Sequence, residues 1–215
     1  MPEIAPPPAS TLTPAKTARQ RTDTFTSIWM IITVARALVT LVVKNRMPQP
    51  LWTMIHLVTL GVLSNGIFQW SWFFARSLAR LSADDPRARR HNTIRVLIFN
   101  AFFALLFVSM WLGWMVGTVI AATGIAAVAA WHGAEMLSVL RERLASRFVG
   151  VVRYYGCSGS FFVLAALLAS FVTVTMFSPS IPEAMVAMRD RLTLAHALSG
   201  VAGWVGLTIG GTVIT

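Results

Sequence analysis

Residues 154–177 read YYGCSGSFFVLAALLASFVTVTMF and contain no Asp, Glu, Lys or Arg. A helix needs ~20 apolar residues to cross the ~30 Å hydrocarbon layer of a bilayer. Because a helix satisfies its own backbone hydrogen bonds, it is the form that such a run takes in lipid. The stretch therefore predicts a transmembrane helix, which spans Val151–Phe177 once its flanks are included.

The rest of the chain has the same character. Of its 215 residues, 56% are hydrophobic and 12% are charged, whereas a soluble domain carries about 25% charged residues. The mean hydropathy is +0.67. Six apolar runs are expected to span the membrane: Phe25–Val43, Leu51–Ala75, Ile94–Trp111, Gly117–Leu140, Val151–Phe177 and Leu192–Thr215. The fold class is thus an all-α polytopic transmembrane bundle, with residues 25–215 as a single domain. The boundary at Gly113–Gly117 leaves open a five-span alternative with a buried or re-entrant element.

The first segment, Met1–Thr24, is rich in Pro, Ala and Thr and holds too little apolar material to fold alone. No apolar region follows a short basic start, as it would in a signal peptide. We expect a disordered cytoplasmic tail.

Basic residues set the orientation, because cytoplasmic loops carry the excess of Lys and Arg. One side collects Lys16, Arg19, Arg21, Arg76, Arg80, Arg87, Arg89, Arg90, Arg95, Arg141, Arg143, Arg147 and Arg153. The other side has Lys44, Arg46, Arg189 and Arg191. The first side, and with it both chain ends, is predicted to be cytoplasmic, in the plasma membrane of a bacterium. This pattern also accounts for the net charge of +10 without nucleic-acid binding, since no basic groove with interleaved aromatics is present.

Several classes of chemistry are excluded or disfavoured. The single cysteine, Cys157, rules out an internal disulfide and a Cys-based zinc or iron–sulfur site. No P-loop, dinucleotide fingerprint, GxSxG or HExxH motif occurs, and no loop is long enough for a catalytic domain. We therefore do not expect an enzyme that acts on its own.

Three histidines lie inside predicted spans, where ionisable residues are costly and indicate function. His56 is five residues beyond Leu51 and His196 is four beyond Leu192. Both are thus ~6–8 Å below the outer boundary, at 1.5 Å per residue, and can share one layer. His132 is ~22 Å into its own span and cannot join them.

Helix faces suggest a cofactor for this layer. At 100° per residue, His196 shares a stripe with Gly200, Gly203, Leu207 and Gly210, and His56 shares one with Leu60, Leu63, Ile67 and Trp70. Two facing imidazoles are a means of holding haem b iron in a bundle. Plain packing of glycines against a neighbouring helix explains the first stripe equally well. Arg36, ~10 Å inside the first span, has to pair or snorkel, and a haem propionate or a neighbouring carboxylate would satisfy it.

Copper is the alternative ligand. Met54 and His56 form an M-x-H pair, and Met185 and Met188 form M-x-x-M on the outer side. Thioether and imidazole suit Cu(I), although methionine is also ordinary membrane packing material.

A second polar pair lies near the cytoplasmic side. His132 and Glu135 are three residues apart on one helix face, within pairing distance. A structural interfacial pair and a proton-handling pair are both open, and the first is favoured.

Two stretches carry a family resemblance. HLVTLGVLSNGIFQWSWFFARSLAR (His56–Arg80) resembles the membrane region that precedes the cupredoxin part of actinobacterial multicopper-oxidase-like proteins. AHALSGVAGWVGLTIGGTVIT (Ala195–Thr215) resembles the same family's "AH-x-x-LNLLGWVGLT" element and is similar to histidine-bearing helices of NnrS-type and haem-copper oxidase-like membrane proteins. WHGAEMLSVLRERLASRFVGVVRYY (Trp131–Tyr155) fits the family's weaker middle portion, so the resemblance covers residues 50–215.

The chain departs from that pattern at two positions. Gly200 stands where the family has Asn, and Phe73 stands where a second His often occurs. The chain also stops where the family continues toward its copper domain. The resemblance implies a membrane subunit, non-catalytic by itself, in a respiratory, copper or nitrogen-oxide oxidoreductase assembly, with other membrane-protein subunits and lipid as partners. The alternative is a protein that itself binds haem b or copper through His56 and His196.

Overall fold

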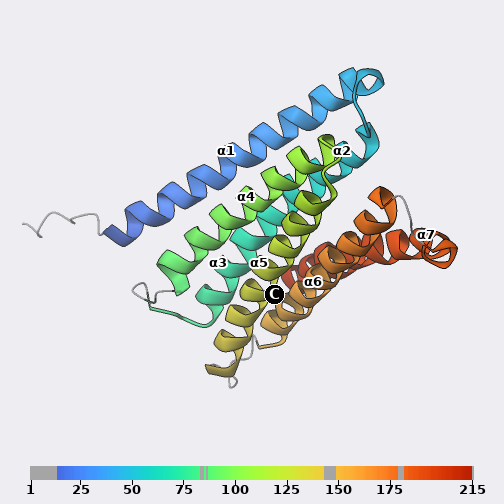
Figure 1. Ribbon diagram of the computed structural model, residues 1–215. Helices are drawn as coiled ribbons and strands as arrows, with labels where there is room; N and C mark the ends of the chain where they lie inside the picture. Colours follow the sequence, from blue (N-terminus) through green and yellow to red (C-terminus); the bar gives the residue numbers. More distant parts are fainter. Residues whose placement is uncertain (1–13, 83–84, 86, 143–148, 179–181, 215) are drawn as a thin grey trace, which may run out of the picture.

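The computed structural model is a bundle of helices (Figure 1). It describes residues 14–82, 85, 87–142, 149–178 and 182–214, and within these ranges every regular element is helical. Six helical stretches are long and apolar enough to cross a membrane: Asp23–Arg46, Pro50–Leu78, Asn92–Trp111, Met115–Val139, Gly150–Phe177 and Glu183–Val213. The predicted all-α bundle with six spans is confirmed.

Three spans are built from one continuous helix and three from several segments. The first comprises α1 (Pro14–Val43) and a 3₁₀ turn, η1 (Lys44–Arg46); the second α2 (Pro50–His56), η2 (Leu57–Ser64) and α3 (Asn65–Leu78). After η3 (Arg87–His91), α4 (Asn92–Trp111), α5 (Met115–Glu142) and α6 (Val149–Phe177) are the continuous ones. The last consists of α7 (Glu183–Leu198), η4 (Ser199–Gly206) and α8 (Leu207–Val213).

Two boundaries differ from those expected. Helix α1 begins at Pro14, within the segment expected to be a tail, and residues 1–13 lie outside the described ranges. The last span begins at Glu183 rather than at Leu192. Its added turns carry Arg189, Asp190 and Arg191, so the helix continues through a charged stretch that a hydropathy pattern places in water.

The corner between α4 and α5 resolves the question of five or six spans. Gly113 has φ +65°, the left-handed conformation that ends many helices and that glycine adopts without strain. The amide of Trp114 donates to the carbonyl of Ser109 at 2.8 Å, which caps the end of α4. Gly117 then lies against the side chains of Trp114 and Ser109. The chain therefore reverses here, and two separate spans meet at the turn.

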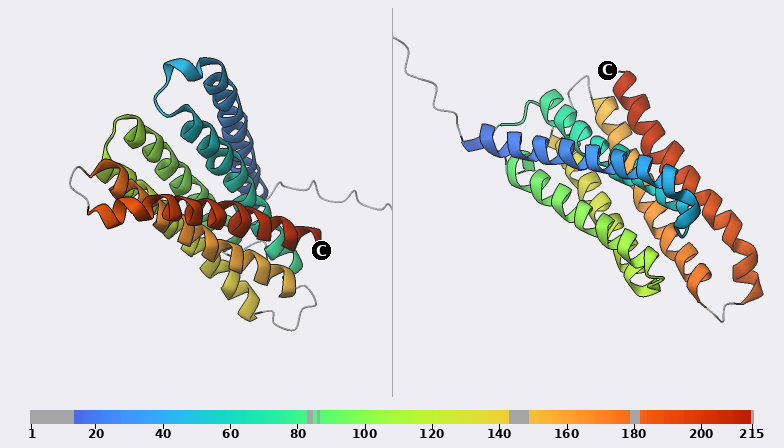
Figure 2. Two further views of the ribbon diagram at one scale, coloured as in Figure 1. Left: turned by 90° about the vertical axis from the view of Figure 1, so that its right-hand side faces the viewer. Right: turned by 90° about the horizontal axis from the view of Figure 1, so that it is seen from above.

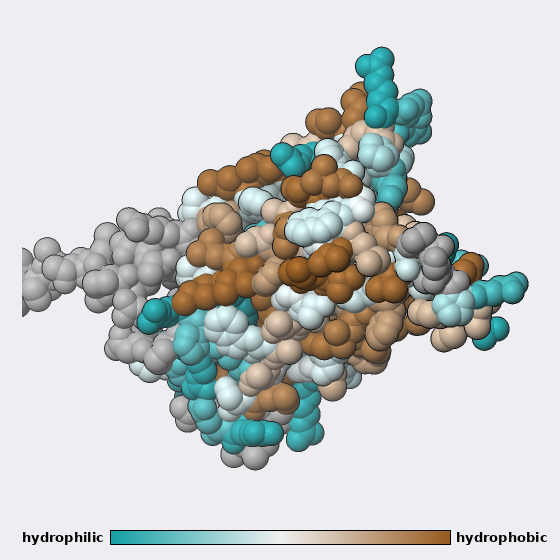
Figure 3. Space-filling model, in the orientation of Figure 1, coloured by the Kyte–Doolittle hydropathy of each residue, from teal (hydrophilic) through white to brown (hydrophobic). Residues whose placement is uncertain are grey.

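A mainly aromatic core joins the helices. The last span lies along α6 (Figure 2), where Phe162 stacks on Trp204 with ring centroids 4.7 Å apart. Phe68 of α3 contacts both of these rings and Phe99 of α4. Burial of these rings fixes the helices around one centre. The outer surface is largely apolar, with hydrophilic residues gathered at the ends of the bundle (Figure 3), as expected for a surface that faces lipid.

Helix α1 packs on the bundle through a narrow polar face. Thr26, Thr33 and Thr40 are its buried residues, and they recur every seven positions. A Cβ atom on Gly61 would lie 2.7 Å from Thr33, so the glycine allows α1 to approach η2 closely. Most of the other large apolar residues of α1 are exposed. Helix α1 thus packs against the bundle on one side and is exposed on the others.

The segments η2 and η4 are both π-helices of eight residues. A π-helix makes i→i+5 bonds and is wider than an α-helix, so it rotates everything that follows it. Of the residues predicted to share the face of His56, Leu60 is therefore buried as expected, whereas Trp70 has turned away and is 59% exposed. Below His196, Gly203 contacts Phe161 as the stripe predicts, whereas Gly211 rather than Gly210 approaches α6.

Candidate functional site

The structure brings His56 and His196 together. Their ring centroids are 6.1 Å apart and their planes are inclined by 10°. His56 is the last residue of α2, directly before η2, and His196 lies two residues before the end of α7, shortly before η4. The two π-helices therefore begin just below the two imidazoles, and π-helical segments are rare and often occur at functional sites.

Each imidazole is oriented by a backbone carbonyl. Nδ1 of His56 is 2.8 Å from the carbonyl oxygen of Trp52, and Nδ1 of His196 is 2.8 Å from that of Ala165. Because a carbonyl only accepts, both Nδ1 atoms carry the proton and donate. In the neutral tautomer that results, Nε2 has a free lone pair on each ring. This is the arrangement that metal-ligating histidines adopt.

Aromatic and small residues surround the pair. Trp52 stacks on His56 with ring centroids 4.3 Å apart, and Phe107 of α4 packs on Trp52 at 5.2 Å. Ala165 is buried at the other histidine. Both imidazoles are themselves half-buried. The pair thus lies in apolar surroundings, in the half of the bundle that the basic residues predict to be outer, and remains partly accessible.

The methionines predicted as copper ligands are not arranged around this pair. Met54 and His56 are two residues apart on α2, hence ~200° apart around the helix. Met185 and Met188 precede His196 by eleven and eight residues, which is ~16 Å and ~12 Å along α7. Among the described residues, no group of three or more His, Cys, Asp or Glu side chains could hold a metal ion. The site therefore offers two nitrogen ligands.

Arg36 is exposed on α1. Its side chain makes no hydrogen bond or ion pair with the described part of the chain. Only its backbone carbonyl is bonded there, to the hydroxyl of Thr40. An arginine near the centre of a span costs about 2.5–3.5 kcal/mol on insertion scales. The prediction that it binds a cofactor carboxylate remains a prediction.

A buried polar layer lies below the histidine pair. The indole of Trp204 donates to Ser64 Oγ at 3.0 Å. The amides of Asn65 and Asn100 donate to each other, at 3.0 and 2.8 Å, and both side chains are buried. These bonds join the second span to the last span and to α4, and they fix the helices that carry His56 and His196.

His132 occupies a separate place, as its depth predicts. Its Nε2 is 3.0 Å from Ser71 Oγ, and Phe68 contacts the ring edge to face at 4.8 Å. Since the Ser71 hydroxyl donates to the carbonyl of Ile67, Nε2 has to be the donor in the contact with His132. Nδ1 is then a bare acceptor, buried and without a partner among the described residues.

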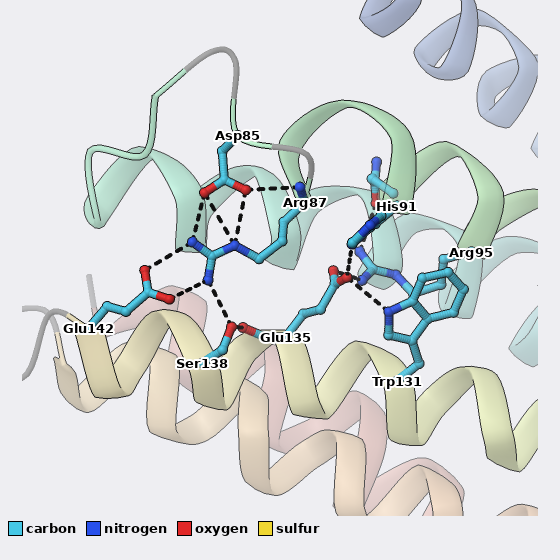
Figure 4. A network of polar contacts seen from close by, with 9 residues as sticks. Asp85, Arg87, His91, Arg95, Trp131, Glu135, Ser138 and Glu142 are labelled. Carbon is cyan, nitrogen blue, oxygen red and sulfur yellow. Dashed lines mark hydrogen bonds and ion pairs between the residues drawn. The ribbon is translucent and has the colours of Figure 1, made fainter.

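The expected contact between His132 and Glu135 is not made. Figure 4 shows Glu135 turned toward the adjoining helices, where it accepts from His91 Nδ1 at 2.8 Å and from Arg95 Nη1 at 2.5 Å. The indole of Trp131 adds a third bond at 2.9 Å. Arg95 is fully buried. Glu135 pairs with Arg95 rather than with the nearby His132, because a buried guanidinium without a carboxylate is strongly destabilising.

Further bonds extend this inner network across the bundle. Arg95 also donates to Asn92 Oδ1 at 2.9 Å, the Asn92 amide lies 3.4 Å from Gln69 Oε1, and Gln69 donates to Asp23 of α1. Four helices, α1, α3, α4 and α5, are thereby connected through side chains. Sequence alone points to basic residues and to Glu135 in this region but does not find this network, because the partners come from separate helices.

A second ion-pair cluster closes the same end (Figure 4). Arg87 bonds Asp85 at 2.7 Å, Glu142 at 2.7 Å and Ser138 at 2.9 Å. The hydrogen bonds from Arg87 lower the pKa of Asp85 below its usual value, and those to Asp85 and Glu142 raise the pKa of Arg87. The cluster attaches the segment before α4 to the end of α5.

Comparisons with protein-family models, with curated proteins and with solved structures found no match.

Proposed function

We propose that this chain is a membrane-embedded electron-transfer subunit that holds haem b between His56 and His196. The observation that carries the proposal is the spacing of the two rings. A metal–nitrogen bond is ~2 Å and a ring nitrogen lies ~1.1 Å from its ring centroid, so two imidazoles on one metal have centroids ~6.2 Å apart. The observed centroid distance is 6.1 Å.

The protonation of the rings supports the same assignment. Both Nδ1 atoms are used by backbone carbonyls, so both Nε2 lone pairs are available for a metal without loss of a proton. The carbonyls hold each ring in place and make it a better ligand.

The number of protein ligands favours haem over a bare copper ion. Only two nitrogens converge here, and the methionines of the sequence-based copper set lie at a distance along the helices or on another face. His56 and His196 would hold the haem iron, and the porphyrin would supply the other ligands that the protein does not provide. When bound, haem b supplies one-electron redox chemistry.

The setting of the proposed site fits a subunit rather than an independent enzyme. Six spans account for most of the described chain, and within the described residues no connection between them is long enough for a catalytic domain. We place the protein in a bacterial plasma membrane, within a respiratory, copper or nitrogen-oxide type of oxidoreductase assembly. A partner subunit of that assembly exchanges electrons with the site.

The test is the visible spectrum of the full chain, purified in mild detergent from cells that make haem. We expect a reduced-minus-oxidised difference spectrum of low-spin six-coordinate haem, about one haem per chain by pyridine haemochrome assay, and less than a tenth of it in His56→Ala or His196→Ala. The control is His132→Ala, which removes a more deeply buried imidazole outside the pair and should retain the haem.

Two results would contradict the proposal. In the first, mass spectrometry finds one copper per chain, no haem spectrum is seen, and the copper is lost in the same two variants. This result would assign the pair to Cu(I). A chain with neither haem nor copper, recovered with redox partners, is an accessory subunit whose histidines only pack.

A further inference from the structure

Arg36 lies near the middle of the first span. The span covers Asp23–Arg46, so Arg36 is ~15 Å from its nearer end and ~20 Å from its farther end along the axis. Its side chain is exposed. The buried Arg95 of α4 bonds a carboxylate, whereas Arg36 bonds none among the described residues.

Snorkelling is a poor solution for this side chain. In an α-helix the Cα–Cβ bond tilts toward the N-terminus, and long side chains follow that direction. For Arg36 this direction leads toward Asp23, the farther end of the span, and away from the nearer end at Arg46. The favoured rotamers thus keep the guanidinium in the middle of the layer, where a charge needs a partner.

The described part of the chain offers no carboxylate at this depth. Glu135 is bonded to Arg95 and His91. The other carboxylates in the described spans lie toward span ends: Asp23, Glu183 and Asp190. A second copy of this chain would lack a suitable carboxylate for the same reason.

The surface around Arg36 is suited to another helix. Ile32 and Val39, one turn to either side, are 44% and 59% exposed. Figure 1 shows α1 along the edge of the bundle, and its span has the smallest buried share of the six. The exposed strip is apolar apart from a single cation.

We infer that this strip is the docking surface for a transmembrane helix of another subunit that carries an Asp or Glu at mid-bilayer depth. Charge complementarity selects such a partner over lipid, because lipid phosphates lie at the membrane surface. The carboxylate and the guanidinium neutralise each other, and Ile32 and Val39 pack beside them. The inference does not depend on haem binding.

Photo-crosslinking in whole cells tests the surface. A photoreactive phenylalanine at Val39 should yield an adduct of one defined mass, reduced at least tenfold by Arg36→Ala and less than threefold by Arg36→Lys, which keeps the cation. Leu41 is the matched control position: it is 52% exposed, lies at nearly the same depth and points to the opposite side, and should yield no such adduct.

The chemistry of the partner decides the outcome. The cross-linked peptide should come from a transmembrane segment that contains Asp or Glu. The variant Arg36→Asp should abolish the adduct, and changing the acidic residue of the partner to Arg should restore it. An adduct with this same chain, with lipid alone, or with a segment without acidic residues would overturn the proposal, as would equal adducts at Val39 and Leu41. If Arg36→Ala instead removes a haem spectrum and leaves the adduct intact, Arg36 serves the cofactor.

Discussion

The two ends of the bundle treat their buried polar groups differently. At the inner end, Glu135 accepts from both Arg95 and His91, and Arg87 bonds Asp85, Glu142 and Ser138. At the outer half, His56 and His196 each use one nitrogen on a carbonyl and keep the other. The ion pairs of the inner end are formed within the chain, although Arg95 Nε and His132 Nδ1 are buried without a partner among the described residues. His56 and His196, in contrast, each keep a second ring nitrogen that makes no hydrogen bond with the described part of the chain.

This difference separates structural from functional polar groups in a membrane bundle. A buried charge that is fully paired fixes helices relative to each other, because breaking the pair leaves a charge in a medium that cannot solvate it. The Nε2 lone pairs of His56 and His196, which accept no hydrogen bond within the described chain, make no such contribution to folding. We therefore expect substitutions at the inner end to change stability and those at the outer pair to change ligand binding.

The largest effect is expected at Glu135. In Glu135→Ala, Arg95 remains buried without its carboxylate, which costs about 3–5 kcal/mol. Thermal or SDS unfolding of the purified protein in detergent measures this loss. The double variant Arg95→Met with Glu135→Leu removes both charges and should recover most of the stability. If the single and double variants unfold alike, the pair is not what joins α4 to α5.

The next effect concerns the contact that positions α7 and η4 on α6. A Cβ atom at Gly203 would lie 2.5 Å from Phe161 Cβ, an atom next to the backbone that cannot move aside. Gly203→Ala should cost about 1–3 kcal/mol through overpacking and should also weaken ligand binding at His196. Gly210→Ala is the control, since nothing lies within 4 Å of its added Cβ. Equal stability of the two variants would show that the last span is free to shift.

Sequence analysis predicts the outer layer better than the inner end. His56 and His196 could be paired from depth alone, because both helices enter from the same side and residues are evenly spaced along the axis. The charged partners of Glu135 could not, because Arg95 and His91 come from across an interhelical boundary, and the nearer His132 is engaged by Ser71. Local spacing finds contacts within one helix only.

The faces of the second and last spans show a different limit. The 100° periodicity holds down to Leu60 and Gly203 and then fails, because the π-helices add a residue to a turn. Trp52 was within reach of sequence reasoning, since it precedes His56 by four residues and so shares its face. Ala165 was not, because it contributes only a backbone carbonyl to His196.

A smaller effect is expected for the amide pair between the two ends. Asn100→Ala removes the partner of the buried Asn65 amide and should cost about 1–2 kcal/mol, as interhelical hydrogen bonds in membranes do. A double-mutant cycle with Asn65→Ala isolates the pair, and we expect a coupling energy of about 1 kcal/mol. A coupling energy near zero would mean that each amide is satisfied by its own helix.

The smallest effect is an acid response of the Arg87 cluster. Asp85 has a folded-state pKa below its ordinary value because Arg87 donates hydrogen bonds to it. Its contribution to stability is therefore fully present above the unfolded pKa of about 4 and is lost as the pH falls through the lower folded pKa.

We expect less than about 1 kcal/mol for this cluster, because ion pairs that water can reach are weak: Asp85 and Arg87 are only partly buried, and Glu142 is 49% exposed. The measurement compares the unfolding temperature at pH 6 and pH 3 for the parent chain and for Asp85→Asn. The variant should be slightly less stable than the parent at pH 6, and the difference should shrink at pH 3, since the asparagine side chain does not titrate. A difference that grows on acidification would show that the carboxylate is held in its neutral form, opposite to the direction that the hydrogen bonds from Arg87 impose.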